Sequence, residues 1–309
     1  MSWVYQAQIM APLLDGNWRH QFAMLPTPYV RSKGEVRIFL GFCDKNMIGR
    51  VGYVDVDPSN PSKIKDISTR PLLDIGRPGT FDDNGVVPIS IINQDNKLHL
   101  YYIGFQLGVR VPYYMFCGLA ISTDDGESFV RVTQVPILER NDEELFARCG
   151  CHVIREKNLW RMWYVGSIAE GWTLKGQKKV PLYTVRHVTS TDGITWQPEV
   201  GQPCITFESD DEHGFGRPFV RRTNDGYEMF LSVRTYSRGY YIARATSNDG
   251  LNWEREKNEL EIVGISEAGW ANENTSYAHT LTVGSDEFLF FNGNGCGKTG
   301  FGYAKWIDN

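Results

Sequence analysis

Apolar and polar positions follow a repeating pattern along the chain, because a run of aromatic and aliphatic residues returns five times. Five such units at nearly even spacing almost fill the 309 residues. Self-similarity at a fixed period is typical of repeat architectures, so the pattern predicts five copies of one structural unit. The runs end at Gly41, Gly104, Gly166, Val233 and Gly293, in steps of 63, 62, 67 and 60 residues.

Each unit also holds an apolar segment before the run and a third strand-like segment after it. The segments are short, rich in β-branched and aromatic residues, and bounded by Gly, Asn, Asp and Pro. No long helical period competes with them, so the chain is expected to be all-β. The third segments are 49–54, 114–120, 183–188, 240–245 and 300–305.

Three units carry a second signature, an Asp-Gly turn followed by an aromatic residue, at 122–129, 190–196 and 247–253. The aspartate can accept local backbone N–H bonds and Gly adopts positive φ without steric cost, so each signature predicts a tight hairpin. Because the same turn recurs from unit to unit, we interpret these aspartates as architectural rather than catalytic.

Four antiparallel strands per unit, arranged radially, predict a five-bladed β-propeller. The last unit ends after three strands at Trp306, so the N-terminal strand, Trp3 to Gln8, is expected to supply the fourth and close the ring. We interpret residues 1–309 as a single domain of this kind.

Composition excludes several classes of protein. The N-terminus lacks a basic stretch followed by an apolar run, and no apolar segment is long enough to cross a membrane. The six cysteines are scattered through a large chain, which indicates reduced thiols and a cytoplasmic protein. The net charge of −5 argues against nucleic acid as a partner.

The chain resembles the five-bladed propeller glycosidases of glycoside hydrolase families 43, 32, 68 and 130, over essentially its whole length. It looks most like poorly characterised members found with bacterial polysaccharide genes. The resemblance is carried by 81–88, 216–220, 240–250, 292–295 and 300–304.

Two departures from the family pattern bear on chemistry. These families commonly place an acid at the start of the first inner strand, where this chain has 24–29 without a carboxylate. Many relatives have Asp directly before the Pro of the second blade, where this chain has Val87 before Pro88. The usual catalytic trio therefore cannot be transferred to this sequence.

The propeller geometry predicts which loops surround one mouth of the central channel. The within-blade links carry eight cations and two anions, a balance of +6 that points to a negatively charged ligand. The between-blade links carry four cations and thirteen acids, a balance of −9 that supplies candidate carboxylates. The within-blade links are 44–47, 106–113, 167–180, 234–239 and 293–300, and the between-blade links are 74–85, 139–148, 208–217 and 265–274.

Asp83, Glu212 and Glu273 are the candidate catalytic residues, because each lies just ahead of an expected inner strand. Glycoside hydrolysis needs a proton donor and a second carboxylate, about 5–5.5 Å apart for retention and 6.5–9.5 Å for inversion. Glu212 or Glu273 would be the general acid, and Asp83 the base or charge modulator. The alternative for each is a structural role, accepting loop N–H bonds or pairing with an arginine.

The candidate substrate-binding side chains are cationic or aromatic residues near the same mouth. A guanidinium suits a sugar carboxylate or phosphate, and an aromatic ring can stack on a sugar face. Structural pairing of the arginines, a capped loop histidine and interblade packing of the tryptophan remain alternatives. The candidates are Arg148, Arg217, Arg234, His213, Trp172 and Tyr277, with His279 as a core or channel histidine.

Two functions stay open from the sequence. The first is a glycosidase-like enzyme that cleaves or transfers an anionic sugar by carboxylate acid/base catalysis. The second is a carbohydrate or nucleotide-sugar binding propeller without hydrolysis. Neither needs a metal or another cofactor, and neither fixes the sugar, the linkage or the oligomeric state.

Overall fold

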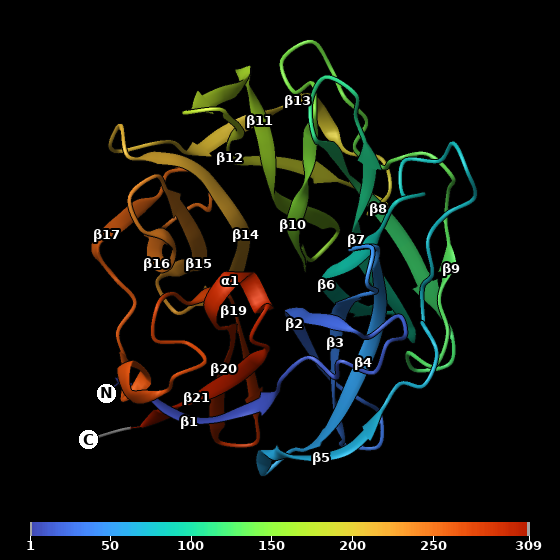
Figure 1. Ribbon diagram of the computed structural model, residues 1–309, viewed down its shortest axis with the longest axis vertical. Coiled ribbons are helices and arrows are strands. Elements are labelled where there is room, and N and C mark those ends of the chain that lie inside the picture. The colour runs from blue at the N-terminus through green and yellow to red at the C-terminus, as the bar shows by residue number, and fades with distance from the viewer. Residues whose placement is uncertain (1, 308–309) are drawn as a thin grey trace.

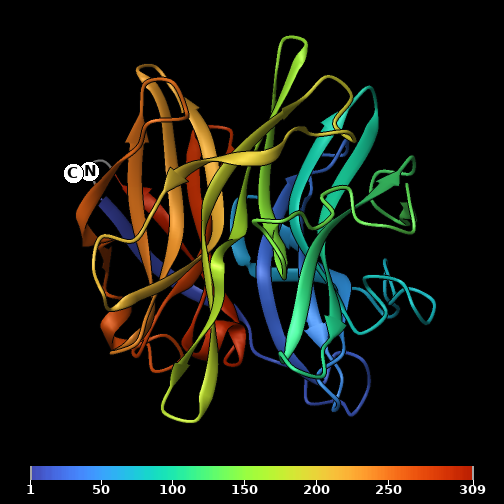
Figure 2. The same ribbon diagram turned by 90° about the horizontal axis from the view of Figure 1, so that it is seen from above.

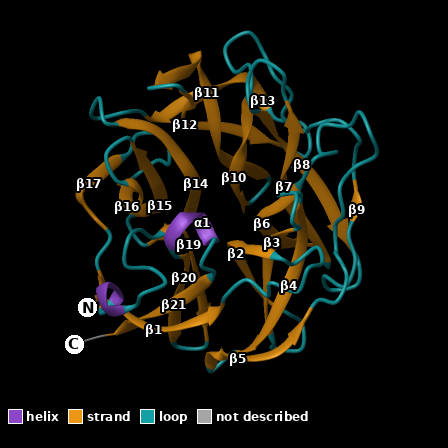
Figure 3. Cartoon of the chain, in the orientation of Figure 1, coloured by secondary structure: helices purple, strands orange, loops and turns teal. Residues whose placement is uncertain are grey.

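The computed structural model describes residues 2–307, and this part of the chain is nearly all β. Helical structure within it is confined to the short turns η1 (Ile265–Glu267) and α1 (Asn294–Gly297), as Figure 3 shows. The prediction of an all-β chain is therefore confirmed. No helix in the described range is both long and apolar enough to cross a membrane.

Strands that follow one another in the sequence pair antiparallel in groups of four. The first group is β2 (Gln21–Val30), β3 (Val36–Cys43), β4 (Gly49–Asp57) and β5 (Asn60–Ile67). The second is β6 (Val86–Gln94), β7 (Lys97–Leu107), β8 (Tyr113–Ser122) and β9 (Val130–Arg131). The third is β10 (Ala147–Glu156), β11 (Leu159–Lys175), β12 (Lys178–Ser190) and β13 (Gln197–Ile205), and the fourth is β14 (Glu212–Thr223), β15 (Gly226–Thr235), β16 (Gly239–Ser247) and β17 (Glu254–Glu259).

The fifth group joins the two ends of the chain in one sheet. Its strands are β19 (Ser276–Val283), β20 (Asp286–Asn292), β21 (Phe301–Ile307) and β1 (Ser2–Met10), with β18 (Ile262–Val263) parallel to β1. The first strand of the chain pairs antiparallel with the last, and Trp3 lies opposite Trp306. Short parallel bridges, β8 to β10 and β12 to β14, link the second, third and fourth groups.

The arrangement is propeller-like, with the first strand of each group nearest the centre. Figure 1 shows β2, β6, β10, β14 and β19 around the middle of the molecule and the later strands of each group further out. The aromatic runs form the second strands and are buried between sheets, where Trp163, Tyr101 and Phe290 are fully covered. Burying such large side chains supplies most of the hydrophobic stabilisation of the fold.

Every innermost strand has a β-bulge at the same place. Residues 25, 88, 150, 217 and 277 lie at these irregularities, each 16 positions before the end of an aromatic run, so the bulges repeat in the same steps as the runs. A bulge bends the strand and changes the direction of a side chain, which suits strands that converge on a centre. Leu25, Gly150, Arg217 and Tyr277 have positive φ there.

The repeated aspartates are architectural, as expected. Asp124, Asp192 and Asp249 each accept hydrogen bonds from backbone N–H groups two to four residues further along the chain. In each turn the preceding serine bonds the same aspartate. The three turns are therefore copies of one local structure.

The segment 167–180 differs from the prediction of a loop. The pairing of β11 with β12 resumes after an irregularity and continues from Trp172 opposite Pro181 to Lys175 opposite Lys178. Trp172 packs on Phe146, with ring centroids 4.7 Å apart, and this contact supports the extended hairpin. The yellow-green hairpin projects at the same end of the molecule as α1 (Figure 2); we call this the mouth end.

Candidate functional site

A cluster of one arginine and four tyrosines lies at the mouth end; we call Arg234, Tyr113, Tyr183, Tyr240 and Tyr277 the Arg234 cluster. Arg234 Nη1 donates a 3.0 Å hydrogen bond to the Tyr183 hydroxyl, and Tyr113 is a second hydrogen-bond partner. The Tyr183 and Tyr240 hydroxyl oxygens are 3.5 Å apart. The rings of Tyr240 and Tyr277 are 5.7 Å apart.

The fold brings these side chains together from four of the five groups. Arg234 is near the end of β15 and pairs with Tyr240 at the start of β16, while Tyr183 lies in β12. Tyr113 begins β8, and Tyr277 occupies the bulge of β19 with φ 59°. The Tyr277 backbone N–H is held by Ser232 Oγ at 2.7 Å, which fixes that bulge to the neighbouring strand β15.

The Arg234 cluster carries a positive charge without an opposing carboxylate. Within residues 2–307, no Asp or Glu oxygen lies within ion-pair distance of Arg234. The Tyr183 phenol raises the pKa of Arg234 further above its usual range, although burial opposes this. Burial also raises the pKa of Tyr113 to about 12, so the hydroxyl stays protonated at neutral pH and can donate. This combination favours an anionic ligand.

Aromatic side chains wall the cluster on one side. The Tyr113 ring lies 5.4 Å from the Trp172 ring, in an edge-on arrangement. His213 stacks on Tyr236 at 4.5 Å, and one of its ring nitrogens lies 3.3 Å from the Pro181 carbonyl oxygen. Burial, together with the nearby Arg234 charge, lowers the pKa of His213 to about 4, so it is neutral near pH 7.

A pocket of about 220 Å³ adjoins the cluster and shares Tyr240 with it. Two carboxylate side chains line this pocket, Glu259 and Glu273. Glu259 accepts a 2.7 Å hydrogen bond from Arg238, whereas Glu273 is exposed and its backbone N–H donates to Asn294. Of the three sequence-predicted carboxylates, Glu273 is thus the one that the fold places beside the Arg234 cluster.

The other two predicted carboxylates are engaged in their own surroundings. Asp83 Oδ2 accepts a hydrogen bond from Gly79 N at 2.8 Å within its loop. Glu212 is buried and bound to Arg255 at 2.6 Å. Structural roles of this kind were the alternatives for both residues.

Arg148 is also held by neighbouring groups. Its Nε lies 3.0 Å from Glu144 Oε2, and its other nitrogens donate to the backbone carbonyls of Glu139 and Glu199. These contacts leave it less available to a ligand than Arg234.

Arg217 occupies the centre of the molecule. It donates to Pro26 O at 2.7 Å, Tyr277 O at 3.2 Å and Thr27 Oγ1 at 2.8 Å, which connects three different groups. Burial lowers its pKa to about 9. His279 lies close enough to Arg217 that burial and this charge hold its pKa well below the usual range.

Sequence reasoning therefore placed Arg234, Tyr277, Trp172 and His213 at one end of the molecule, and the structure brings them into one neighbourhood. It missed Tyr113, Tyr183 and Tyr240. A signal was present, because Tyr183 and Tyr240 begin third segments of their units next to the cationic links. No group of three or more His, Cys, Asp or Glu side chains in the described range is placed to hold a metal ion.

Comparison with known proteins gives the family. The chain is 32% identical over 304 residues to the uncharacterised protein Rv1502 of Mycobacterium tuberculosis, covering 98% of this chain and 99% of the relative. The chain is a member of the family of that protein. Protein MT1551 from a second strain of the same species matches at the same identity and coverage. No family model matches the sequence.

Solved structures share the fold at low identity. A BT0996 complex with RGII superimposes with a TM-score of 0.75 at 17% identity, over 99% of this chain and 92% of that protein. A thermostable family-43 glycoside hydrolase gives 0.66 at 14%, over 94% and 91%. A GH130-family structure, described with hydrolases that target β-1,2 mannosidic linkages in Candida mannan, gives 0.71 at 12%, over 99% and 93%. The resemblance to propeller glycosidase-like proteins is thus confirmed at the level of fold.

Proposed function

We propose that the chain is a single five-bladed propeller that acts as a glycosidase-like enzyme on an anionic sugar, held by the Arg234 cluster. The observation that carries this proposal is the Arg234 guanidinium, which is surrounded by tyrosine hydroxyls and lacks a carboxylate partner in the described part of the chain. The five groups of strands, the shared sheet of the two termini and the glycosidase-like fold support the architecture.

The acid/base chemistry would take place in the adjoining pocket. A sugar whose carboxylate or phosphate contacts Arg234 can extend past Tyr240 towards Glu273 and Glu259. Glu273 would donate a proton to the leaving oxygen. Glu259, held ionised beside Arg238, would orient or deprotonate the attacking water.

Sugar binding without hydrolysis is the second candidate function. It is favoured by the engagement of Asp83 and Glu212 described above and by Val87 at a position where many relatives have Asp. In this case the Arg234 cluster would hold an anionic sugar or a nucleotide sugar, and Glu273 would contribute only hydrogen bonds.

Two variants separate these functions. Charge-assisted hydrogen bonds contribute about 1.5–3 kcal/mol, so we expect Arg234→Met to weaken binding of glucuronic acid oligosaccharides or UDP-glucuronic acid roughly 10- to 150-fold. We expect Glu273→Gln to keep this affinity and to lower turnover at least about 100-fold. Binding is measured by calorimetry and thermal shift, and turnover with 4-nitrophenyl glycosides of uronic acids.

Arg222→Met serves as the matched control, because Arg222 is an exposed arginine at the opposite end of β14. Unchanged binding in Arg234→Met would contradict the site assignment. Ligand binding without turnover of any substrate would favour the second function, and equal turnover in Glu273→Gln would remove that residue from the chemistry.

We further propose a cytoplasmic location. All six cysteines are free thiols, and Cys117 and Cys151 remain unlinked with their sulfur atoms 3.4 Å apart. Such thiols persist in a reducing compartment. Recovery of the protein in a secreted fraction of the native cells would contradict this location.

A further inference from the structure

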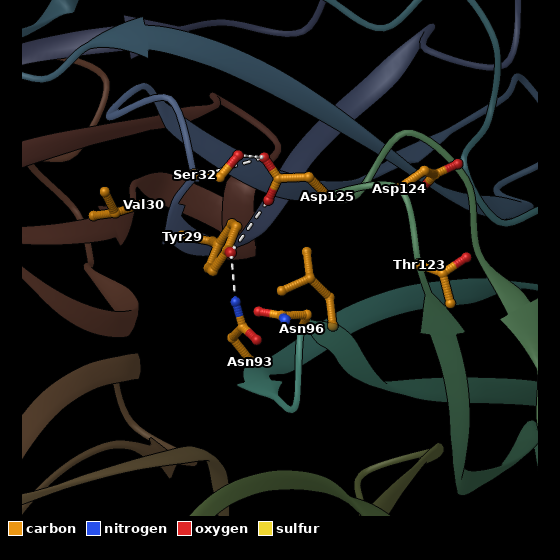
Figure 4. A pocket seen from close by; sticks show the side chains of 9 residues that line it. Tyr29, Val30, Ser32, Asn93, Asn96, Thr123, Asp124 and Asp125 are labelled. Atoms are coloured by element: carbon orange, nitrogen blue, oxygen red, sulfur yellow. Dashed lines mark hydrogen bonds between the residues drawn. The ribbon is translucent and has the colours of Figure 1, made fainter.

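A second pocket lies at the end of the molecule opposite the mouth, between the first two groups of strands. It has a volume of about 480 Å³. It is formed by the end of β2, the hairpin that joins β6 to β7, and the turn after β8 (Figure 4). Since β2 begins at the mouth end and Tyr29 is near its last residue, this pocket is separate from the Arg234 cluster.

The side chains that line the pocket are amides, hydroxyls, carboxylates and one aromatic ring. None of the lining residues is Lys, Arg or His. Asn93 donates a 3.0 Å hydrogen bond to the Tyr29 hydroxyl, and its carbonyl oxygen stays available. Within residues 2–307, neither the Asn96 amide nor the Thr123 hydroxyl has a hydrogen-bond partner in the protein. Groups of this kind pair with the hydroxyls of an uncharged sugar.

An extra residue builds one wall of this pocket. The turns at Ser190 and Ser247 reach Gly two residues after the Thr or Asn, whereas the turn at Ser122 contains one additional residue, Asp125. Asp125 has φ 58°, a conformation that costs a non-glycine residue energy. The hairpin itself closes without such a residue, as the other two turns show. The insertion therefore serves the contact between groups and the pocket.

Asp125 holds the two groups together at this pocket. Its carboxylate accepts hydrogen bonds from Ser32 N at 3.2 Å, Ser32 Oγ at 2.8 Å and the Tyr29 hydroxyl at 3.2 Å, as the dashed lines in Figure 4 show for the side chains. Burial opposes ionisation, but these bonds and the Arg31 charge lower the pKa of Asp125. The carboxylate is thus ionised at neutral pH.

The charge of this pocket is opposite to that of the Arg234 cluster. Hydrogen bonds from Ser128 and Ser122 outweigh burial and lower the pKa of Asp124, so two carboxylates stand at the pocket without a lining cation. An anionic ligand would be repelled. Most of the acceptor positions of Asp124 and Asp125 are already used within the protein, which disfavours a bound metal ion.

We propose that this pocket binds a neutral sugar residue, through hydrogen bonds to Asn93, Asn96 and Thr123 and contact with the Tyr29 ring. The site is independent of the function proposed for the Arg234 cluster. A protein with both sites would hold a carbohydrate that carries anionic and uncharged residues at two places on its surface.

The test is saturation-transfer NMR and titration of the full chain with the neutral disaccharides maltose, cellobiose, mannobiose, xylobiose and trehalose. We expect at least one to bind, and the double variant Asn93→Ala/Thr123→Val to weaken its binding at least about tenfold. Asn248→Ala is the matched control, because Asn248 is exposed at the position of Thr123 in another copy of the turn. It should leave affinity unchanged.

Arg234→Met distinguishes the two sites. Neutral-sugar binding that survives Arg234→Met but is lost in the double variant supports the proposal, whatever happens to anionic ligands. Absence of binding of all five sugars at tens of millimolar would overturn it. Binding that is lost in Arg234→Met and retained in the double variant would also overturn it, as would a response of the Asn93 and Asn96 amide signals to calcium chloride but to no sugar.

Discussion

Replacing Asn292 with alanine is expected to lower the free energy of unfolding by about 3–4 kcal/mol, because it removes three buried hydrogen bonds at once. The side chain is fully buried at the end of β20. Its Oδ1 accepts from Leu25 N at 2.8 Å, and its Nδ2 donates to Ala23 O at 2.7 Å and to Gly300 O at 3.0 Å. These bonds connect the last group of strands to the first.

The position of Leu25 makes this contact more than an ordinary hydrogen bond. Leu25 lies in the bulge of β2 with φ 58°, so its N–H is turned out of the strand ladder and depends on Asn292. Alanine at position 292 would leave this donor and two carbonyl oxygens buried without partners. Each such group costs about 1–3 kcal/mol, which the surrounding structure reduces only in part by relaxing.

Ser232→Ala is the matched comparison, because Ser232 occupies the equivalent position in the fourth group. It makes one such bond, from Tyr277 N to Ser232 Oγ at 2.7 Å, so we expect a loss of about 1–2 kcal/mol. Urea titrations monitored by tryptophan fluorescence give both values. A loss below about 1 kcal/mol in Asn292→Ala would show that the first and last groups are held together by other contacts.

Much of the strand pattern could be predicted from the sequence, because the aromatic runs mark the second strand of each unit directly. The bulges could not be predicted in the same way. Leu25, Pro88, Gly150, Arg217 and Tyr277 repeat in position but share no residue type. Their common geometry comes from the convergence of five strands, which is a tertiary constraint. For the same reason the hairpin of β11 and β12 was mistaken for a loop, since its pairing depends on the packing of Trp172.

The candidate site was predictable in its location and sign of charge, but only partly in its residues. The cationic links indicated an anionic ligand, and Arg234 has the surroundings that fit one. The partners of Glu212 and Arg148 were not predictable. Arg255 is 43 residues from Glu212 in the sequence, and only packing of the sheets decides that these two side chains meet.

Acid is expected to unfold this protein in a pH range set by buried histidines. Burial, together with the nearby Arg217 charge, lowers the pKa of His152 to about 3. Burial next to Arg161 lowers the pKa of His187 to about 3, and Arg161 Nε donates to His187 Nε2 at 3.1 Å, which requires a neutral imidazole. His213 and His279 have lowered pKa values for related reasons.

The direction of the effect follows from proton linkage. In the unfolded chain these histidines have a pKa of about 6.5, so below that pH the unfolded state binds protons that the folded state does not. The stabilising contribution is complete above about pH 6.5 and is lost as the pH falls towards the folded values. Four histidines together lower the free energy of unfolding by roughly 5 kcal/mol between pH 7.5 and pH 5.5. Domains have only about 5–15 kcal/mol in total, so this loss is large.

Urea midpoints measured at half-unit steps from pH 7.5 to pH 5 test this prediction. Most carboxylates titrate below this range, so the slope reports mainly on histidine. His187→Gln removes one of the four groups and keeps an acceptor for Arg161, so the slope should fall by about one proton, or 1.4 kcal/mol per pH unit. A free energy of unfolding that stays constant down to pH 5.5 would mean that these imidazoles accept protons inside the folded protein. The buried Arg217 charge among His152 and His279 makes that outcome physically unfavourable.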